Sequence, residues 1–206
     1  MRAMHTSPED SMHARIVDDL AERGWTQQSL FLPVELLRTL ADECRLRAIR
    51  PASVGRGDGQ EVREAIRGDR IQWLEPGQSV ACDQYLAAMD GLRQALNQGL
   101  YLGLEDYECH FALYPPGAFY RRHLDRFRDD DRRAVSVILY LNEDWQPEDG
   151  GQLRMFLDGD VAHDVQPLAG CLVAFLSADI PHEVLAAGRE RLSLTGWFRR
   201  RGNDPF

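Results

Sequence analysis

The hydrophobic period of this chain changes near residue 107, and that change constrains the fold more than any other feature of the sequence. Before it, apolar residues recur at helical spacing. After it, short segments follow the two-residue period of strands. Turn signals such as "EDGG" and "AAG" separate these β-branched and aromatic segments. The expected strands are 107–115, 133–142, 152–157, 170–177, 182–186 and 191–198. Six short strands in so little chain predict a β-sandwich or jelly roll.

The first half of the chain is expected to be largely helical. Apolar stripes at helical spacing occur within residues 7–24, 32–50 and 79–100. Between the last two helices, "PASVGRGDGQEVREA" has three glycines and no period, so it predicts a mobile loop, and "DRIQWLE" predicts a strand. Helices followed by strands favour helices packed on the outside of the sheet. At 206 residues, a single domain is expected over 1–206, with helices, loop and supporting strand in 1–103 and the β core in 104–200.

Composition excludes several classes of protein. The net charge of −9 argues against bulk attraction to nucleic acid or to an anionic membrane. No apolar run approaches the roughly 20 residues of a membrane span, and the N-terminus lacks the apolar core of a secretory signal. The four cysteines lie far apart and form no C-x-x-C pair. Reduced, packed thiols in a cytoplasmic protein are therefore expected.

One histidine and one aspartate carry the first sign of chemistry. In "RRHLDRFRDD", His123 and Asp125 are two residues apart, so on a strand their side chains share one face. His182 begins another expected strand, just after a proline turn. Two imidazoles and one carboxylate form the set that holds non-haem Fe(II) with adjacent positions open. The same set is also compatible with a hydrolytic zinc site that keeps one position for water.

The strand 191–198 favours the iron interpretation. Alternation places Arg191 and Thr195 on one face together with Ser193 and Trp197. A guanidinium on an inward face is costly unless a ligand satisfies it, and its fork matches a carboxylate. The distal carboxylate of 2-oxoglutarate provides such a partner, and Tyr140 is placed to add a phenolic hydrogen bond. The alternative is an ordinary surface ion pair of Arg191 with Glu190 or Glu183.

Two further histidines are given other roles. His163 is followed directly by Asp164, so the two side chains would point to opposite faces of a strand, and a ligand role is not expected. His110 would lie on the same strand face as Tyr114, and a hydrogen-bonded core histidine is expected there.

Three segments resemble the iron- and 2-oxoglutarate-dependent prolyl hydroxylases of the hypoxia-sensing, EGL-9-like type. They are "YPPGAFYRRHLD", "ILYLNEDWQPEDGGQLRMF" and "PHEVLAAGRERLSLTGWF", and "IRGDRIQWLE" extends the resemblance upstream. The resemblance implies a double-stranded β-helix, the jelly roll of 2-oxoglutarate dioxygenases, over 104–200.

The resemblance also implies site residues and cofactors. His123, Asp125 and His182 would bind Fe(II), with 2-oxoglutarate and O2 as co-substrates and ascorbate as a candidate reductant. The distal carboxylate would contact Arg191 and Tyr140, with Tyr114 and Thr195 nearby. Residues 51–70 would form a lid. The residues expected to face the substrate are Arg67, Asp69, Trp197 and either Arg132 or Arg133.

The segment between Asp125 and Tyr140 departs from the animal enzymes, because it is one residue longer and more charged. The choice between Arg132 and Arg133 therefore stays open. The chain looks like a compact bacterial version of the family, for which a protein substrate is implied and translation elongation factor Tu is a candidate. The alternatives are a small-molecule hydroxylase on the same scaffold, a nucleic-acid demethylase using the same cofactors, and a non-enzymatic cupin-like metal-binding protein.

Overall fold

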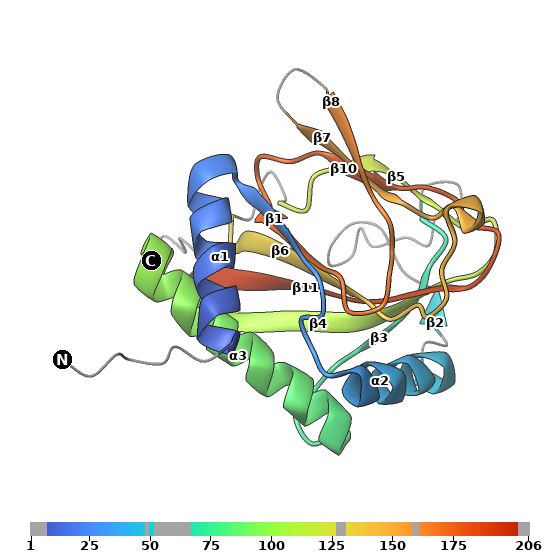
Figure 1. Cartoon of the computed structure of the whole chain (residues 1–206), viewed down its shortest axis with the longest axis horizontal. Coiled ribbons are helices and arrows are strands. Elements are labelled where there is room, and N and C mark those ends of the chain that lie inside the picture. The colour runs from blue at the N-terminus through green and yellow to red at the C-terminus, as the bar shows by residue number, and fades with distance from the viewer. Residues whose placement is uncertain (1–7, 48–49, 52–66, 127–130, 158–160, 202–206) are drawn as a thin grey trace, which may run out of the picture.

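Two antiparallel β-sheets form the core of the protein (Figure 1). The computed structural model describes residues 8–47, 50–51, 67–126, 131–157 and 161–201. The major sheet has the strand order β1-β9-β6-β11-β4-β3-β2, and the minor sheet has the order β5-β10-β7-β8. Together they make the jelly roll that the periodicity predicted. The strands are β1 (Trp25–Gln28), β2 (Arg50–Pro51), β3 (Arg70–Trp73), β4 (Leu104–Tyr114), β5 (Tyr120–His123), β6 (Arg133–Tyr140), β7 (Leu153–Leu157), β8 (Val161–Val165), β9 (Leu172–Leu176), β10 (His182–Val184) and β11 (Arg191–Arg200).

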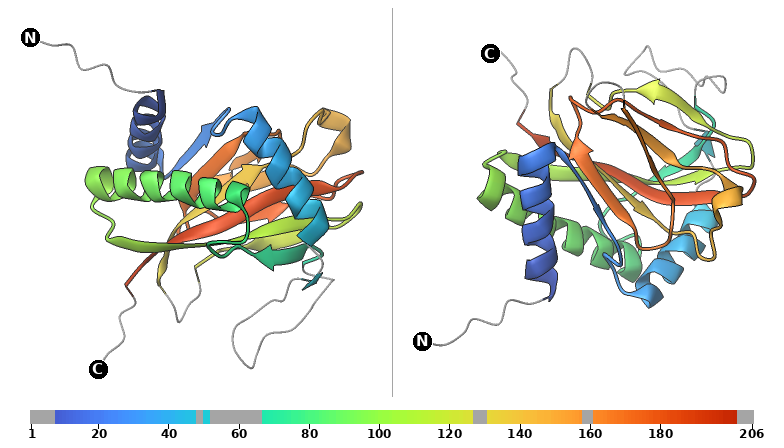
Figure 2. Two further views of the ribbon diagram at one scale, coloured as in Figure 1. Left: turned by 90° about the horizontal axis from the view of Figure 1, so that it is seen from below. Right: turned by 45° about the horizontal axis from the view of Figure 1, so that its top comes forward.

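The major sheet is covered on its outer face by helices (Figure 2). These are α2 (Val34–Arg47) and α3 (Val80–Leu100), while α1 (Pro8–Arg23) packs on α3 and β1. At the start of α3, the Ser79 hydroxyl accepts a hydrogen bond from the Cys82 amide at 3.0 Å. At its end, Tyr101 caps the helix in a left-handed conformation with a φ of 55°. Such a cap satisfies amides and carbonyls that the helix itself leaves without partners.

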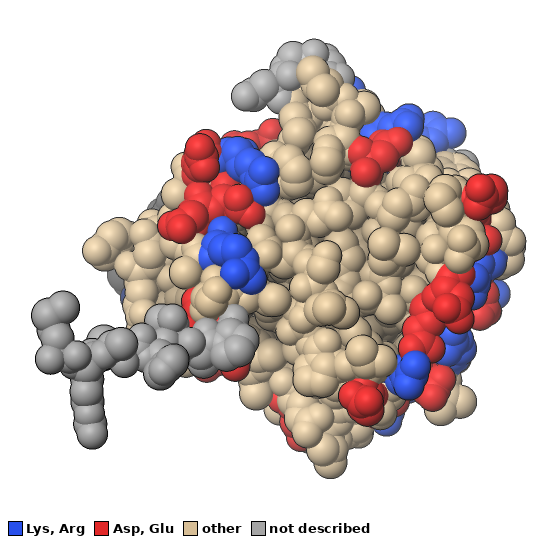
Figure 3. Space-filling model, in the orientation of Figure 1, with Lys and Arg blue, Asp and Glu red and all other residues tan. Residues whose placement is uncertain are grey.

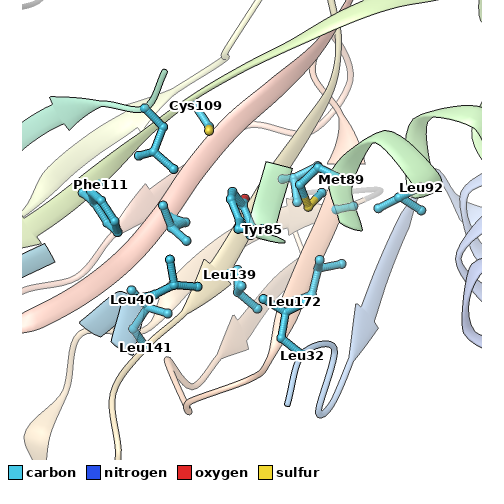
Figure 4. Packing of buried hydrophobic residues seen from close by; sticks show 14 of the residues in the cluster. Leu32, Leu40, Tyr85, Met89, Leu92, Cys109, Phe111, Leu139, Leu141 and Leu172 are labelled. Atoms are coloured by element: carbon cyan, nitrogen blue, oxygen red, sulfur yellow. The ribbon is translucent and has the colours of Figure 1, made fainter. Parts of the chain in front are cut away.

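The outer hydrophobic cluster joins these helices to alternate residues of the sheet (Figure 4). Leu40, Tyr85 and Met89 of the helices are fully buried against Phe111 and Leu139 of the strands. The next residues along those strands, including Ala112 and Tyr140, instead belong to a second cluster between the two sheets. The major sheet is thus buried on both faces, and the inner cluster adjoins the candidate site.

The sequence predicted most elements but not all. The helices, the strand at 70–73 and the six expected β segments are present, although β4 begins at Leu104 rather than at 107. The short strands β1, β2, β5 and β8 were not among the expected segments. Each has five residues or fewer and is held by pairing with a neighbour, which local periodicity does not encode. Most of the predicted lid, residues 52–66, lies outside the described residues.

The four cysteines are all buried free thiols, as expected from their spacing. Within the described residues, no helix is long and apolar enough to cross a membrane. Figure 3 shows acidic and basic side chains side by side at the margins of one face rather than in a field of one sign. Charge of both signs at close range favours local ion pairs over long-range steering.

Gly196 lies in the middle of β11, directly opposite Cys109 of β4. A Cβ atom at this position would come within 2.6 Å of the Glu108 carbonyl oxygen and of the Cys109 Cβ. We expect Gly196→Ala to lower the free energy of unfolding by about 1–3 kcal/mol, the usual cost of overpacking. Gly188→Ala is the control, because its Cβ would meet only the Asp149 carbonyl oxygen at 3.8 Å. Urea denaturation of both variants checks this, and equal stabilities would contradict the close packing at β11.

Candidate active site

His123 and His182 stand directly opposite each other on the neighbouring strands β5 and β10 of the minor sheet. Their ring centroids are 4.3 Å apart. The strand β5 ends at His123, and Asp125 follows two residues later. The Asp125 side chain is 8% exposed. One ligand atom from each of the three residues lies within 4.8 Å of the other two, so the group could hold a metal ion. The side chains of His123 and Asp125 therefore lie on the same side of the chain, as the sequence predicted.

The backbone orients both imidazole rings. His123 Nδ1 lies 2.8 Å from the Arg121 carbonyl oxygen, and His182 Nδ1 lies 3.1 Å from that of Ile180. Each Nδ1 therefore carries the proton and donates, which leaves each Nε2 lone pair available for a metal. Burial lowers the pKa of His182 to about 4, so this ring is neutral at pH 7. A neutral ring is the form that binds a metal.

Aromatic neighbours hold the same two rings from the side. Tyr120 stacks on His123 with a centroid distance of 3.7 Å and an interplanar angle of 18°. Phe175 of β9 meets His182 edge-on at 4.7 Å. These contacts restrict rotation of the imidazoles, so the ligand set is preorganised by packing as well as by hydrogen bonds.

The Asp125 carboxylate is oriented by two serines. Ser136 of β6 donates to Asp125 Oδ2 at 2.7 Å, and the Ser177 hydroxyl lies 2.8 Å from that of Ser136. Burial by itself raises the pKa of Asp125, but the neighbouring imidazoles and the Ser136 hydroxyl outweigh it and hold the pKa well below its usual range. The carboxylate is therefore ionised, and with the two imidazoles it forms the donor set typical of non-haem Fe(II).

Arg191 lies inside the barrel, as its parity predicted. It is 2% exposed, and its Nε donates to the Gly151 carbonyl oxygen at 2.8 Å. The guanidinium carbon lies 5.0 Å and 5.2 Å from the ring centroids of Tyr140 and Tyr114. The Tyr140 hydroxyl is buried without a hydrogen-bond partner among the described residues. A buried cation beside an unpartnered hydroxyl fits the distal carboxylate of 2-oxoglutarate, which would satisfy both.

Thr195 and Trp197 continue the inward face of β11. Thr195 is half-buried, and its hydroxyl lies 3.4 Å from that of Ser193. Trp197 is directly opposite Ser136, so it stands beside the hydroxyl that orients Asp125. Its neighbours are Trp73 of β3 and His110 of β4, with ring centroids 6.4 Å and 5.7 Å away. His110 is a buried histidine whose Nδ1 bonds the Phe111 carbonyl, as expected.

The two arginines left open by the sequence are placed differently. The guanidinium of Arg133 lies 3.5 Å from the Trp197 ring centroid. Arg132 precedes β6, and its carbonyl oxygen accepts the Arg200 amide at 2.9 Å. The structure therefore brings Arg133 to the site beside Trp197.

Arg67 and Asp69 bind each other. Two hydrogen bonds join them, at 2.6 Å and 2.9 Å, and the Asp69 side chain is fully buried. Arg67 also lies over the ring of Tyr120 at 4.9 Å, which connects the pair to the ring stacked on His123. The Asp69 carboxylate is buried and already paired, so the predicted contact with substrate would fall to Arg67 of this pair.

His163 shares an inward row with the candidate ligands. The register aligns His123, His182, Met155 and His163 across the four strands of the minor sheet. Asp164 points to the other face and binds Arg154 at 2.8 Å, as parity predicted. His163 packs on Trp25 of β1, with ring centroids 4.6 Å apart, two strands away from His182. It is not part of the metal-competent group.

Sequence reasoning did not identify Ser136, Ser177 or Tyr120 as parts of the site. Ser136 shares the parity of Tyr140, so its inward position was visible, but its partner Asp125 was not. Ser177 and Tyr120 reach the site only through the pairing of β9 and β5 with their neighbours.

Comparisons with known proteins agree with this site. Residues 109–199 match the model of the 2OG-Fe(II) oxygenase superfamily. Egl nine homolog 1 of Homo sapiens is 35% identical over 156 residues, which are 68% of this chain and 36% of that protein. The hypoxia-inducible factor prolyl hydroxylase of Caenorhabditis elegans is 37% identical over 89% of this chain and 27% of its own length. The chain thus spans about a third of the length of these curated relatives.

Two solved structures share the whole architecture. A prolyl hydroxylase of Trichoplax adhaerens, in complex with a hypoxia-inducible factor peptide fragment, is 28% identical, with a TM-score of 0.80 over 93% of this chain and 90% of that one. The crystal structure of a Pseudomonas putida prolyl-4-hydroxylase is 70% identical, with a TM-score of 0.86 over 93% of this chain and 100% of that one. On this identity and coverage, the chain belongs to the prolyl hydroxylases of the 2OG-Fe(II) oxygenase superfamily.

Proposed function

We propose that this protein hydroxylates a prolyl residue of a protein substrate, with His123, Asp125 and His182 holding Fe(II). The observation that carries the proposal is the grouping of two backbone-oriented imidazoles with an ionised carboxylate inside a barrel that also buries Arg191. When bound, the iron and 2-oxoglutarate supply the activation of O2 that oxidises a C–H bond, with succinate and carbon dioxide released.

The residues of the chain orient and isolate this chemistry. Arg191 and Tyr140 bind the distal carboxylate, with Tyr114 and Thr195 beside it, because a buried guanidinium requires an anionic partner. The Nδ1–H groups of the two histidines remain bonded to backbone carbonyls, which keeps both Nε2 atoms directed at the metal. Asp125 and His182 are buried, which limits the access of water to the reacting centre.

A peptide is the proposed substrate because aromatic and arginine side chains line the approach to the metal group. Trp73 is 41% exposed there, beside Trp197 and Arg133. The Trichoplax relative was solved with a peptide fragment, and a bacterial relative is a prolyl-4-hydroxylase, which supports a prolyl target. Translation elongation factor Tu is the candidate protein to be tested first.

Mass spectrometry of peptides incubated with the protein tests the function. Proline-containing peptides of the candidate protein should gain the mass of one oxygen atom only when Fe(II), 2-oxoglutarate and O2 are all present. The matched control is the same peptide with the target proline replaced by alanine. Oxidation of the control peptide, or succinate release that no peptide stimulates, would contradict prolyl hydroxylation.

Loss of one metal ligand should abolish binding of Mn(II), a redox-stable substitute for Fe(II). We expect this for His182→Ala and Asp125→Ala, because two ligands alone cannot complete the facial set. His163→Ala is the matched control, since this histidine lies in the same inward row but two strands away. Calorimetric titration with Mn(II) measures the effect. Normal Mn(II) affinity in His182→Ala would overturn the ligand assignment.

Replacing Arg191 by lysine should weaken 2-oxoglutarate binding by roughly 10- to 150-fold. Lysine keeps the charge but loses the planar fork, and a charged hydrogen bond is worth about 1.5–3 kcal/mol. Mn(II) affinity should hardly change, because Arg191 is not a ligand. Arg189→Ala is the control, since Arg189 is 46% exposed and contacts Asp149 at the surface. Weaker co-substrate binding in Arg189→Ala alone would refute the assigned site.

A further inference from the structure

Four charged residues form a row across three strands at the end of β11 that lies beside the candidate metal group. Arg199 of β11 stands directly opposite Asp106 of β4 on one side and Arg133 of β6 on the other. The pairing of β11 with both neighbours is irregular at this end, between Phe198 and Arg200. We call Arg133, Glu108, Arg199 and Asp106 the charge ladder.

Glu108 joins the two arginines of the ladder. Its Oε1 accepts from Arg133 Nε at 2.9 Å, and its Oε2 accepts from Arg199 Nη1 at 2.8 Å. Arg199 in turn binds Asp106 through two hydrogen bonds, at 2.7 Å and 2.8 Å. Both carboxylate oxygens of Glu108 therefore accept a hydrogen bond from an arginine, and positive and negative side chains alternate along the row.

The ladder is poorly suited to stabilising the fold or attracting ligands. The side chains of Arg133, Glu108 and Arg199 are 18%, 23% and 28% exposed, and ion pairs that reach solvent contribute little to stability. The charges of two arginines and two acidic residues also sum to zero, so the row attracts no charged ligand from a distance. Its effect is geometric, because it fixes where the Arg133 guanidinium lies.

That position is the face of Trp197. The Arg133 guanidinium lies 3.5 Å from the indole centroid, within the range of a cation–π contact. Trp197 is 4% exposed, and its Nε1–H is buried without an acceptor among the described residues. A buried donor without a partner calls for an acceptor from outside the described protein, such as a peptide carbonyl. Trp197 also stands opposite Ser136, which bonds Asp125.

We propose that Glu108 is a positioning residue for substrate recognition: together with Arg199 it holds Arg133 over the Trp197 ring, and the two side chains form one wall of the peptide site. The proposal rests on the proposed function for the identity of the substrate, but the positioning itself is a property of the chain alone. It also selects Arg133 over Arg132 as the arginine that faces substrate.

Removing the Glu108 charge should release Arg133 without touching the metal or co-substrate groups. In Glu108→Gln, we expect KM for the prolyl peptide substrate to rise about 3- to 30-fold. This is the effect of losing one charge-assisted hydrogen bond at a partly exposed site. The affinity for 2-oxoglutarate should be unchanged. Asp164→Asn is the matched control, because Asp164 binds Arg154 through a similar cross-strand pair on the outward face of the minor sheet.

A double-mutant cycle separates positioning from a general loss of stability. Once Arg133→Met has removed the guanidinium, adding Glu108→Gln should raise KM no further, since the two residues act through one contact. Additive effects in the double variant, or an equal loss of 2-oxoglutarate affinity in Glu108→Gln, would overturn the proposal.

NMR makes the test independent of catalysis. In the wild-type protein, the ring current of Trp197 should shift the side-chain resonances of Arg133, and Glu108→Gln should abolish that shift. Unchanged Arg133 resonances in Glu108→Gln would disprove positioning whether or not any peptide is hydroxylated. If the shift is lost but the wild-type protein modifies no prolyl peptide, the positioning role stands and the proposed function fails.

Discussion

The direct pairing of His123 with His182 across β5 and β10 is the contact on which the rest of the site depends. Opposed residues on neighbouring strands have Cβ atoms about 5 Å apart, so both imidazoles can reach one metal ion. Each ring then uses Nδ1 on a nearby carbonyl, so the backbone of the same strand segments selects the tautomer. Asp125 completes the group because it keeps the parity of His123 just beyond the strand end. A one-residue slip of β10 would turn His182 to the outer face of the minor sheet.

The central strand β11 spaces the functions of the site along one inward face. Arg191 at its start is buried against Tyr114 and Tyr140, Trp197 stands beside the hydroxyl that orients Asp125, and Arg199 ends the row at the rim. The alternate residues Leu192, Leu194 and Phe198 are buried under the helices. Packing on the outer face thus holds the inner face in place, and Gly196 permits the close approach of β4 that this requires.

Within the part of the chain that the structure describes, the buried charges Asp69 and Asp125 are paired, whereas Arg191 is not. Asp69 is neutralised by Arg67, and Asp125 is held by two imidazoles and a serine hydroxyl. Arg191 is different, because it is 2% exposed and donates to a neutral carbonyl. A guanidinium without an anion among the described residues is unfavourable in such a place. Together with the unpartnered Tyr140 hydroxyl, it supports the anionic co-substrate site that we propose there.

The sequence by itself determined which side chains share a face. The parity of His123 with Asp125, and of Arg191 with Thr195 and Trp197, follows from covalent strand geometry, which needs no information about neighbours. The two-residue period after residue 107 likewise predicted a jelly roll, and helical spacing before it predicted the outer layer. Only the tertiary structure decided which strands face one another. The opposition of His123 and His182, the Arg67–Asp69 pair, the serines that orient Asp125 and the contact of Arg133 with Glu108 all join segments distant in sequence or hidden by short strands. Pairing register depends on packing and hydrogen bonds summed over the whole sheet, so no local pattern encodes it.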